Sequence, residues 1–191
     1  MNNFLEKSDQ ELVKLSLENQ ENFLYLMKRY EKKLIYYILK ISNVSYEDAE
    51  DLLQEIYIKV YHNLNDYDPG LKFSSWIYRI AHNQVISNYR KLKVRPQSVF
   101  WEIEDHALKN LISEIDVQEE TDENLLRENI KKVIKTLDKK YRDVLVLRYL
   151  EDKDYKEISD ILRKPMGTVA TLLNKAKAIF KDKIKEQKIK L

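Results

Sequence analysis

Apolar residues recur every three or four positions along most of this 191-residue chain, which is the spacing of helices that bury one face. The clearest stripe runs from Ala49 to Leu64 and fills each expected step with an aliphatic or aromatic side chain. Ser45 and Asp48 precede it at the spacing of a capping box. The pattern predicts a helix over about residues 46–64 and, with similar stripes elsewhere, an all-α protein with short connections.

Other helix starts are marked by residues that commonly cap helices. Ser74 or Ser75 is expected to cap a helix that runs through the aromatic and basic stretch within residues 72–95, and Asp138 a helix that includes Tyr149. Asp154, with Glu157 three residues on, predicts a further capping box.

Composition narrows the classes of function. The chain has two glycines, three prolines and no cysteine, so disulfides, thiolate zinc sites and cysteine nucleophiles are excluded. Its three histidines, His62, His82 and His106, have no metal-ligand spacing, and there is no glycine-rich phosphate loop. We therefore expect no enzyme activity, no metal and no cofactor. The absence of a signal-peptide pattern or a long apolar run predicts a cytoplasmic protein without membrane insertion.

The net charge of +2 hides a strong segregation along the chain. Residues 1–95 have a net charge of +1, residues 96–124 of −8, and residues 125–191 of +9. This predicts two small helical domains, 1–95 and 125–191, joined by an acidic linker at 96–124 with a short helix near residues 107–112. A basic last third indicates a polyanionic partner.

One face of the predicted helix over residues 46–64 is acidic and also carries Ile58. A solvated face explains the acids, several of which lie in the first turn where the helix dipole favours them. A bulky aliphatic residue on that face is less readily explained and suggests a protein partner.

Residues 72–95 combine aromatic and basic side chains without any acid. Such a stretch is suited to holding single-stranded nucleic acid, because rings stack on bases and cations neutralise phosphates. An amphipathic helix with aromatics in the core is the simpler interpretation of the stretch by itself. If Ile77, Ile80, Ala81 and Val85 form the buried side of a helix, the residues left free to point elsewhere are Trp76, Arg79, Asn83, Asn88 and Arg90.

Residues 163–167 interrupt a helix with Pro165 and Gly167, and Thr168 is a suitable cap for the basic helix that follows. A short helix, a turn and a longer basic helix form a helix-turn-helix, whose second helix enters the major groove of DNA. A plain helical hairpin is the alternative, and the basic charge of this third favours DNA.

Three blocks in this order resemble the sigma-70 family of bacterial sigma factors, in its extracytoplasmic-function type. They are DAEDLLQEIYIKVYHNL (48–64), FSSWIYRIAHNQVISNYRK (73–91), and YRDVLVLRYLEDKDYKEISDIL (141–162) with MGTVATLLNKAKAIF (166–180). The resemblance implies a region 2-like domain that docks on core RNA polymerase and opens the −10 element of promoter DNA. It also implies a region 4-like domain that reads the −35 element, and an anti-sigma factor as a common inhibitory partner.

The resemblance also implies roles for individual residues. Those expected to bind core polymerase are Asp48, Asp51, Gln54, Glu55 and Ile58. Those expected to bind −10 DNA are Trp76, Arg79, Asn83, Asn88, Arg90, Lys91 and Lys93. Those expected to bind −35 DNA are Thr168, Thr171, Asn174, Lys175 and Lys177.

The recognition helix departs from the family pattern, since Ala170 and Leu172 stand where relatives usually have basic residues. Losing arginine removes the best bidentate guanine reader, so we expect a different −35 preference or greater reliance on DNA shape. A helix-turn-helix regulator that acts without polymerase is the alternative function. It would have no need of the aromatic and basic element at residues 72–95.

Overall fold

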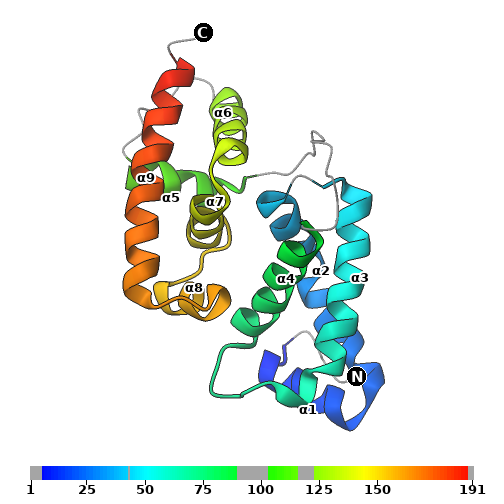
Figure 1. Ribbon diagram of the computed structural model, residues 1–191. Coiled ribbons are helices and arrows are strands. Elements are labelled where there is room, and N and C mark those ends of the chain that lie inside the picture. Colours follow the sequence, from blue (N-terminus) through cyan, green and yellow to red (C-terminus); the bar gives the residue numbers. More distant parts are fainter. Residues whose placement is uncertain (1–5, 43, 90–102, 116–122, 189–191) are drawn as a thin grey trace. The chain divides into compact units, whose positions relative to one another are not determined.

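The computed structural model describes residues 6–42, 44–89, 103–115 and 123–188, and within these ranges it contains helices and connecting turns but no strand (Figure 1). The all-α prediction is confirmed. The chain separates near residue 100 into two compact units.

The first unit is built from α1 (Asp9–Glu18), η1 (Gln20–Asn22), α2 (Phe23–Ile41), α3 (Tyr46–His62), η2 (Leu64–Asp66) and α4 (Phe73–Tyr89). Helices α2, α3 and α4 contact one another, and α1 packs across α2 and α4. Their shared core contains Tyr37, Ile38, Ile56, Val60 and Ala81, all almost fully buried. The stripe predicted for α3 therefore faces this core, except at Tyr61, which is 39% exposed.

The start of α3 is fixed by the predicted capping box. Asp48 N–H donates to Ser45 Oγ at 3.0 Å, and Ser45 N–H donates back to Asp48 Oδ2 at 3.2 Å. Two N–H groups that the helix itself cannot pair are thereby satisfied.

The start of α4 differs from the prediction. The helix begins at Phe73, and the N–H groups of Ser75 and Trp76 donate to the backbone oxygen of Lys72 at 3.0 and 3.2 Å. Neither serine is the cap, because Phe73 already belongs to the first turn and is buried in the core. Because the helix starts at Phe73, both Phe73 and Trp76 are helical, and their spacing of three residues places them on the same side of α4.

The second unit is built from α5 (Asp105–Ile115), α6 (Glu123–Thr136), α7 (Lys139–Leu145), the π-helical turn η3 (Val146–Leu150), α8 (Tyr155–Leu162) and α9 (Met166–Lys188). Helix α9 packs along α7 and α6, and buries Val169, Leu173, Ala176, Phe180 and Ile184. The capping box of α8 is present as predicted, with Glu157 N–H donating to Asp154 Oδ1 at 2.8 Å. Asp138 precedes α7 as predicted, but its side chain makes no capping hydrogen bond.

The acidic segment 96–124 is only partly described, since residues 96–102 and 116–122 lie outside the described ranges. Helix α5, in its middle, is longer than the short helix expected there and packs against η3 and α9. Ile103, Ala107, Leu108 and Leu111 are buried by this packing. Residues 105–115, which were expected to lie in the linker, therefore belong to the second unit, because the apolar side of α5 completes its core.

The turn between α8 and α9 is made by Arg163 and not by Gly167. Arg163 ends α8 with left-handed backbone angles, φ 51° and ψ 48°, and the N–H of Lys164 donates to Ser159 O at 3.1 Å. Helix α9 begins at Met166, so Gly167 and Thr168 are already helical. Thr168 is thus the third residue of the helix and not its cap.

Candidate protein and nucleic-acid interfaces

The polar face of α3 is exposed along its length. Asp51, Gln54 and Glu55 are exposed, and Ile58 has 58% of its surface accessible, although it is isoleucine. Asp48 is exposed too, but both of its capping contacts tie it to Ser45. The four residues from Asp51 to Ile58 form a continuous surface on consecutive turns that mixes negative charge with one apolar side chain.

A groove between α2 and α3 adjoins this surface. Its α3 wall includes Glu50, Asp51 and Gln54, and its α2 wall includes Lys28 and Tyr36. No residue of α2 was predicted from the sequence to belong to this surface. The α2 wall carries the exposed cations Lys28 and Lys32 beside the exposed Leu24, but a solvated helix gives the same sequence pattern.

Helix α4 does not present its tryptophan to solvent. Trp76 is only 5% exposed, and its ring lies 5.6 Å from Tyr67 and 5.5 Å from Phe73, measured between ring centroids. Tyr30 joins the same cluster through Phe73, at 5.6 Å. The prediction that Trp76 points outward is therefore wrong, because the start of α4 directs it into the aromatic core.

The polar residues of α4 that were expected to face outward are more exposed than Trp76. Asn83 is exposed, as predicted, while Arg79 and Asn88 are half-buried. Arg90, Lys91 and Lys93 lie outside the described residues. The exposed contact that α4 offers within the described residues is thus polar and not aromatic.

Gln84, next to Asn83, joins α4 to the polar face of α3. Lys59 Nζ donates to Gln84 Oε1, and Gln84 Nε2 donates to Glu55 Oε2. Gln84 is 7% exposed, whereas both of its partners on α3 are exposed. Sequence periodicity gave no sign of this role, since a glutamine on a helix usually faces water.

The outer face of α9 matches the prediction in its exposure. Thr168, Thr171, Asn174 and Lys175 are exposed, and Lys177 is half-buried. Thr171 Oγ1 donates to Gly167 O at 2.9 Å, so its hydroxyl hydrogen is engaged and its oxygen remains an acceptor. Asn174 and Lys175 are exposed hydrogen-bond donors on this face.

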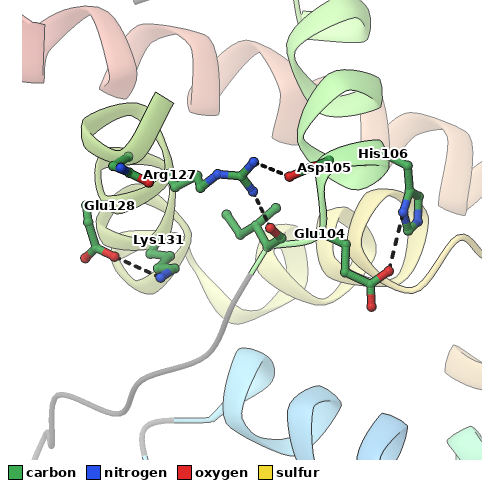
Figure 2. A pocket seen from close by; sticks show the side chains of 8 residues that line it. Glu104, Asp105, His106, Arg127, Glu128 and Lys131 are labelled. Atoms are coloured by element: carbon green, nitrogen blue, oxygen red, sulfur yellow. Dashed lines mark hydrogen bonds and ion pairs between the residues drawn. The ribbon is translucent and has the colours of Figure 1, made fainter. Parts of the chain in front are cut away.

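A surface pocket lies between the start of α5 and the outer side of α6 (Figure 2). Arg127 crosses it and donates to the backbone oxygen of Ile103 and to Asp105 Oδ1, the latter at 2.5 Å. Lys131 pairs with Glu128 at 2.8 Å, and this hydrogen bond lowers the pKa of the Glu128 carboxyl. Arg127 thus ties the start of α5 to α6. Because Arg127 and Lys131 both already bind acceptors within the protein, the pocket offers little to an anionic ligand.

Asp143 and Glu157 are buried carboxylates in the described part of the second unit. Asp143 is almost fully buried, and burial raises the pKa of its carboxyl, an effect opposed by Lys139, whose Nζ lies 2.6 Å from Asp143 Oδ2. Buried charges require such partners, so this pair is assigned to the packing of α7.

The described residues contain no cluster of histidine, aspartate and glutamate that could hold a metal ion. Among the helices of the described part, none is long and apolar enough to cross a membrane.

Comparison with known proteins agrees with these two units. Residues 26–95 match the family model of sigma-70 region 2, and residues 127–179 match that of sigma-70, region 4. The chain is 30% identical over 176 residues to the ECF RNA polymerase sigma factor SigW of Bacillus subtilis, covering 88% of this chain and 91% of that protein. It is 29% identical over 184 residues to the ECF RNA polymerase sigma-E factor of Escherichia coli K12, covering 93% and 94%.

A solved structure of the sigma factor RpoE in complex with the anti-sigma factor NepR from Bartonella quintana has the same fold. Its TM-score with this chain is 0.65 at 18% identity, over 86% of this chain and 98% of that one. The chain belongs to the sigma-70 family, in its extracytoplasmic-function (ECF) group. The resemblance found in the three sequence blocks is confirmed, while α1 and α5 lie outside both matched regions.

Proposed function

We propose that this chain is the promoter-specificity subunit of a bacterial RNA polymerase, binding the core enzyme and promoting strand opening at initiation. The observation that carries the proposal is the order of the two family matches, region 2 on the first helical unit and region 4 on the second. The relatives named above are RNA polymerase sigma factors, and this chain matches them along nearly their whole length.

For core polymerase we assign the exposed face of α3, with Asp51, Gln54, Glu55 and Ile58 as its centre. Negative charge steers a protein toward a basic partner, and an exposed isoleucine adds apolar area that is favourable only once covered. Asp48 lies at the edge of this face, and its carboxylate also forms the capping box of α3 with Ser45.

For the −10 element we assign the outer side of α4, with Asn83 as the contact and Arg79 and Asn88 beside it. Asparagine presents both a donor and an acceptor to the edge of an unstacked base. Arg90, Lys91 and Lys93 are proposed as phosphate contacts from sequence alone. Trp76 acts by packing, since its ring is enclosed by Phe73 and Tyr67.

For the −35 element we assign the outer face of α9. Asn174 and Lys175 are the donors to base edges and phosphates, and Thr171 is an acceptor. Thr168 lies in the first turn, and Lys177 lies farther along the helix toward the backbone of the DNA. Because Ala170 and Leu172 offer no hydrogen bonds, we expect a larger share of the affinity to come from phosphates and DNA shape.

The chain is proposed to have no catalytic activity of its own and to work in the cytoplasm, where the polymerase is. An anti-sigma protein is a proposed inhibitory partner, as the solved complex of RpoE with NepR illustrates for a protein of the same fold.

Co-elution with core polymerase on gel filtration, followed by transcription from a promoter selected by the holoenzyme, tests the proposal. We expect a stable holoenzyme and initiation that depends on the chain. A chain that binds duplex DNA yet never joins the core enzyme would instead be a helix-turn-helix regulator.

A further inference from the structure

Gln84 is a buried side chain that contacts two charged residues of α3, Glu55 of the candidate polymerase face and Lys59 one turn farther along. Its amide accepts a hydrogen bond from Lys59 Nζ and donates one to Glu55 Oε2, so the amide lies between a cation and an anion of α3. This arrangement crosses from α4 to α3, two helices that pack together in the first unit.

Without the amide, these two charges would be expected to meet directly. Glu55 and Lys59 are four residues apart on α3, with the glutamate nearer the N-terminus, which is the favourable arrangement for an ion pair on a helix. In the structure both side chains are instead bonded to Gln84. The amide therefore keeps the ammonium group off the carboxylate.

The consequence concerns what Glu55 presents to a partner. A direct ion pair would neutralise its charge and occupy its oxygens, whereas the amide engages only Oε2 and leaves Oε1 for an incoming donor. The hydrogen bond also fixes the carboxylate before binding, so less side-chain entropy is lost on association. Lys59 polarises the amide and strengthens its donation to Glu55.

We propose that Gln84 is a positioning residue of the polymerase-docking face, which separates Lys59 from Glu55 and holds the carboxylate ready for a cationic or N–H donor of core polymerase. The inference rests on the proposed role of the α3 face in docking. It assigns to a residue of α4, the helix that carries Asn83, a function in polymerase binding.

The test measures the affinity of the full-length chain for core polymerase. In Gln84→Leu the volume is nearly kept but both hydrogen bonds are lost, so Lys59 is released to pair with Glu55. We expect the affinity to fall about tenfold, the typical size of one hydrogen bond to a charged group. Gln84→Asn, whose shorter amide cannot span the gap, should lower the affinity in the same way while keeping a polar side chain.

Rescue distinguishes positioning from packing. Adding Lys59→Met to Gln84→Leu removes the competing cation, and we expect it to restore much of the lost affinity. In a Glu55→Ala background, Gln84→Leu should cause no further loss, because the residue through which it acts is gone. Gln10→Leu is the matched control, since it removes another hydrogen bond between segments of the first unit, from Gln10 Nε2 to Pro69 O at 3.0 Å.

The outcomes separate the two proposals. If Glu55→Ala alone leaves the affinity unchanged, the assignment of the α3 face to polymerase is wrong. If Glu55→Ala weakens binding but neither Gln84 variant does, the positioning role is overturned. An equal loss from Gln84→Leu with and without Glu55, or no rescue by Lys59→Met, would also overturn it, because Gln84 would then act through packing alone.

Discussion

Helices α4 and α9 are both amphipathic helices that the sequence associates with DNA, but they differ in the exposure of the residues expected to face outward. On α9 the predicted face, including Thr171, Asn174 and Lys175, is exposed. On α4 the described aromatic residues Phe73, Trp76 and Tyr78 are buried. Polar residues on a basic helix could thus be placed from the sequence, whereas for the aromatic residues of α4 the sequence left a core position and an outward position both open.

The magnitudes explain the difference. An aromatic side chain buries about 150–250 Å², which is worth roughly 4–6 kcal/mol at about 25 cal/mol per Å². Stacking one base on an exposed ring is worth only about 1–3 kcal/mol, and only when nucleic acid is present. When the helix geometry gives an aromatic residue access to the core, burial wins. Asn174 and Lys175 have no such alternative, because burying an amide or ammonium group without partners is costly.

The largest expected effect comes from Trp76. Trp76→Ala should lower the free energy of unfolding of the first unit by about 3–5 kcal/mol, since it removes a ring enclosed by Tyr67 and Phe73. Urea denaturation followed by circular dichroism measures this. Any loss of promoter opening in this variant would follow from unfolding.

Two companion variants sharpen this contrast within α4. Trp76→Phe should keep both stability and promoter opening much closer to the parent, because the core stays largely filled. Asn83→Ala, at an exposed site, should change stability by less than about 0.5 kcal/mol yet slow opening, measured by permanganate reactivity of −10 thymines. If Trp76→Phe remained fully stable but could not open the promoter, a direct contact between Trp76 and a base would have to be reinstated.

What the sequence could predict follows the same division. The capping boxes at Ser45 and Asp154 were correct because they depend on local spacing alone. The stripe of α3 was correct because one helix face is apolar throughout. The predicted start of α4 was wrong, since it depends on how Phe73 packs against Tyr30 and Tyr67, which no local pattern encodes.

The candidate sites show the same limit. Exposure of the α3 and α9 faces was predictable, because long runs of polar residues have few alternatives to solvent. The bridge through Gln84 was not, because it joins residues 25 and 29 positions apart through a contact between two helices. The packing of α5 was hidden by the acidic composition of residues 96–124, which masked Ala107, Leu108 and Leu111 on one side of the helix.

A smaller effect is expected at Lys175 on α9. Lys175→Ala should weaken binding of holoenzyme to −35 duplex and reduce the slope of log affinity against log salt by about 1, because one phosphate contact is lost. Fluorescence anisotropy over a range of salt concentrations measures both quantities, and stability should not change. Lys132→Ala, which removes the same charge from an exposed position on α6, should leave the slope unaltered. Equal slopes for the two variants would show that α9 attracts DNA by net charge alone.

The smallest effects concern the turn that leads into α9, where the sequence suggested that glycine supplies the bend. The left-handed backbone belongs to Arg163, at φ 51°, and a side chain there costs more than glycine would. Arg163→Gly should therefore stabilise the second unit by about 0.5–1 kcal/mol, the relief of strain exceeding the extra chain entropy of glycine. Thermal unfolding of the full-length chain measures the gain, with Arg163→Lys as the control that removes no strain.

Replacing Gly167 by alanine should raise the stability of the second unit, whereas replacing a glycine that makes a turn would lower it. It lies in the first turn of α9 without a positive φ, and a Cβ added there meets no atom within 4 Å. Gly167→Ala should therefore stabilise the unit by about 0.5 kcal/mol, because alanine loses less chain entropy on entering a helix. Destabilisation by Gly167→Ala would mean that the turn reaches residue 167 and that α9 begins at Thr168, as the sequence alone suggested. Arg163→Gly and Gly167→Ala together thus decide which residue makes the bend between α8 and α9.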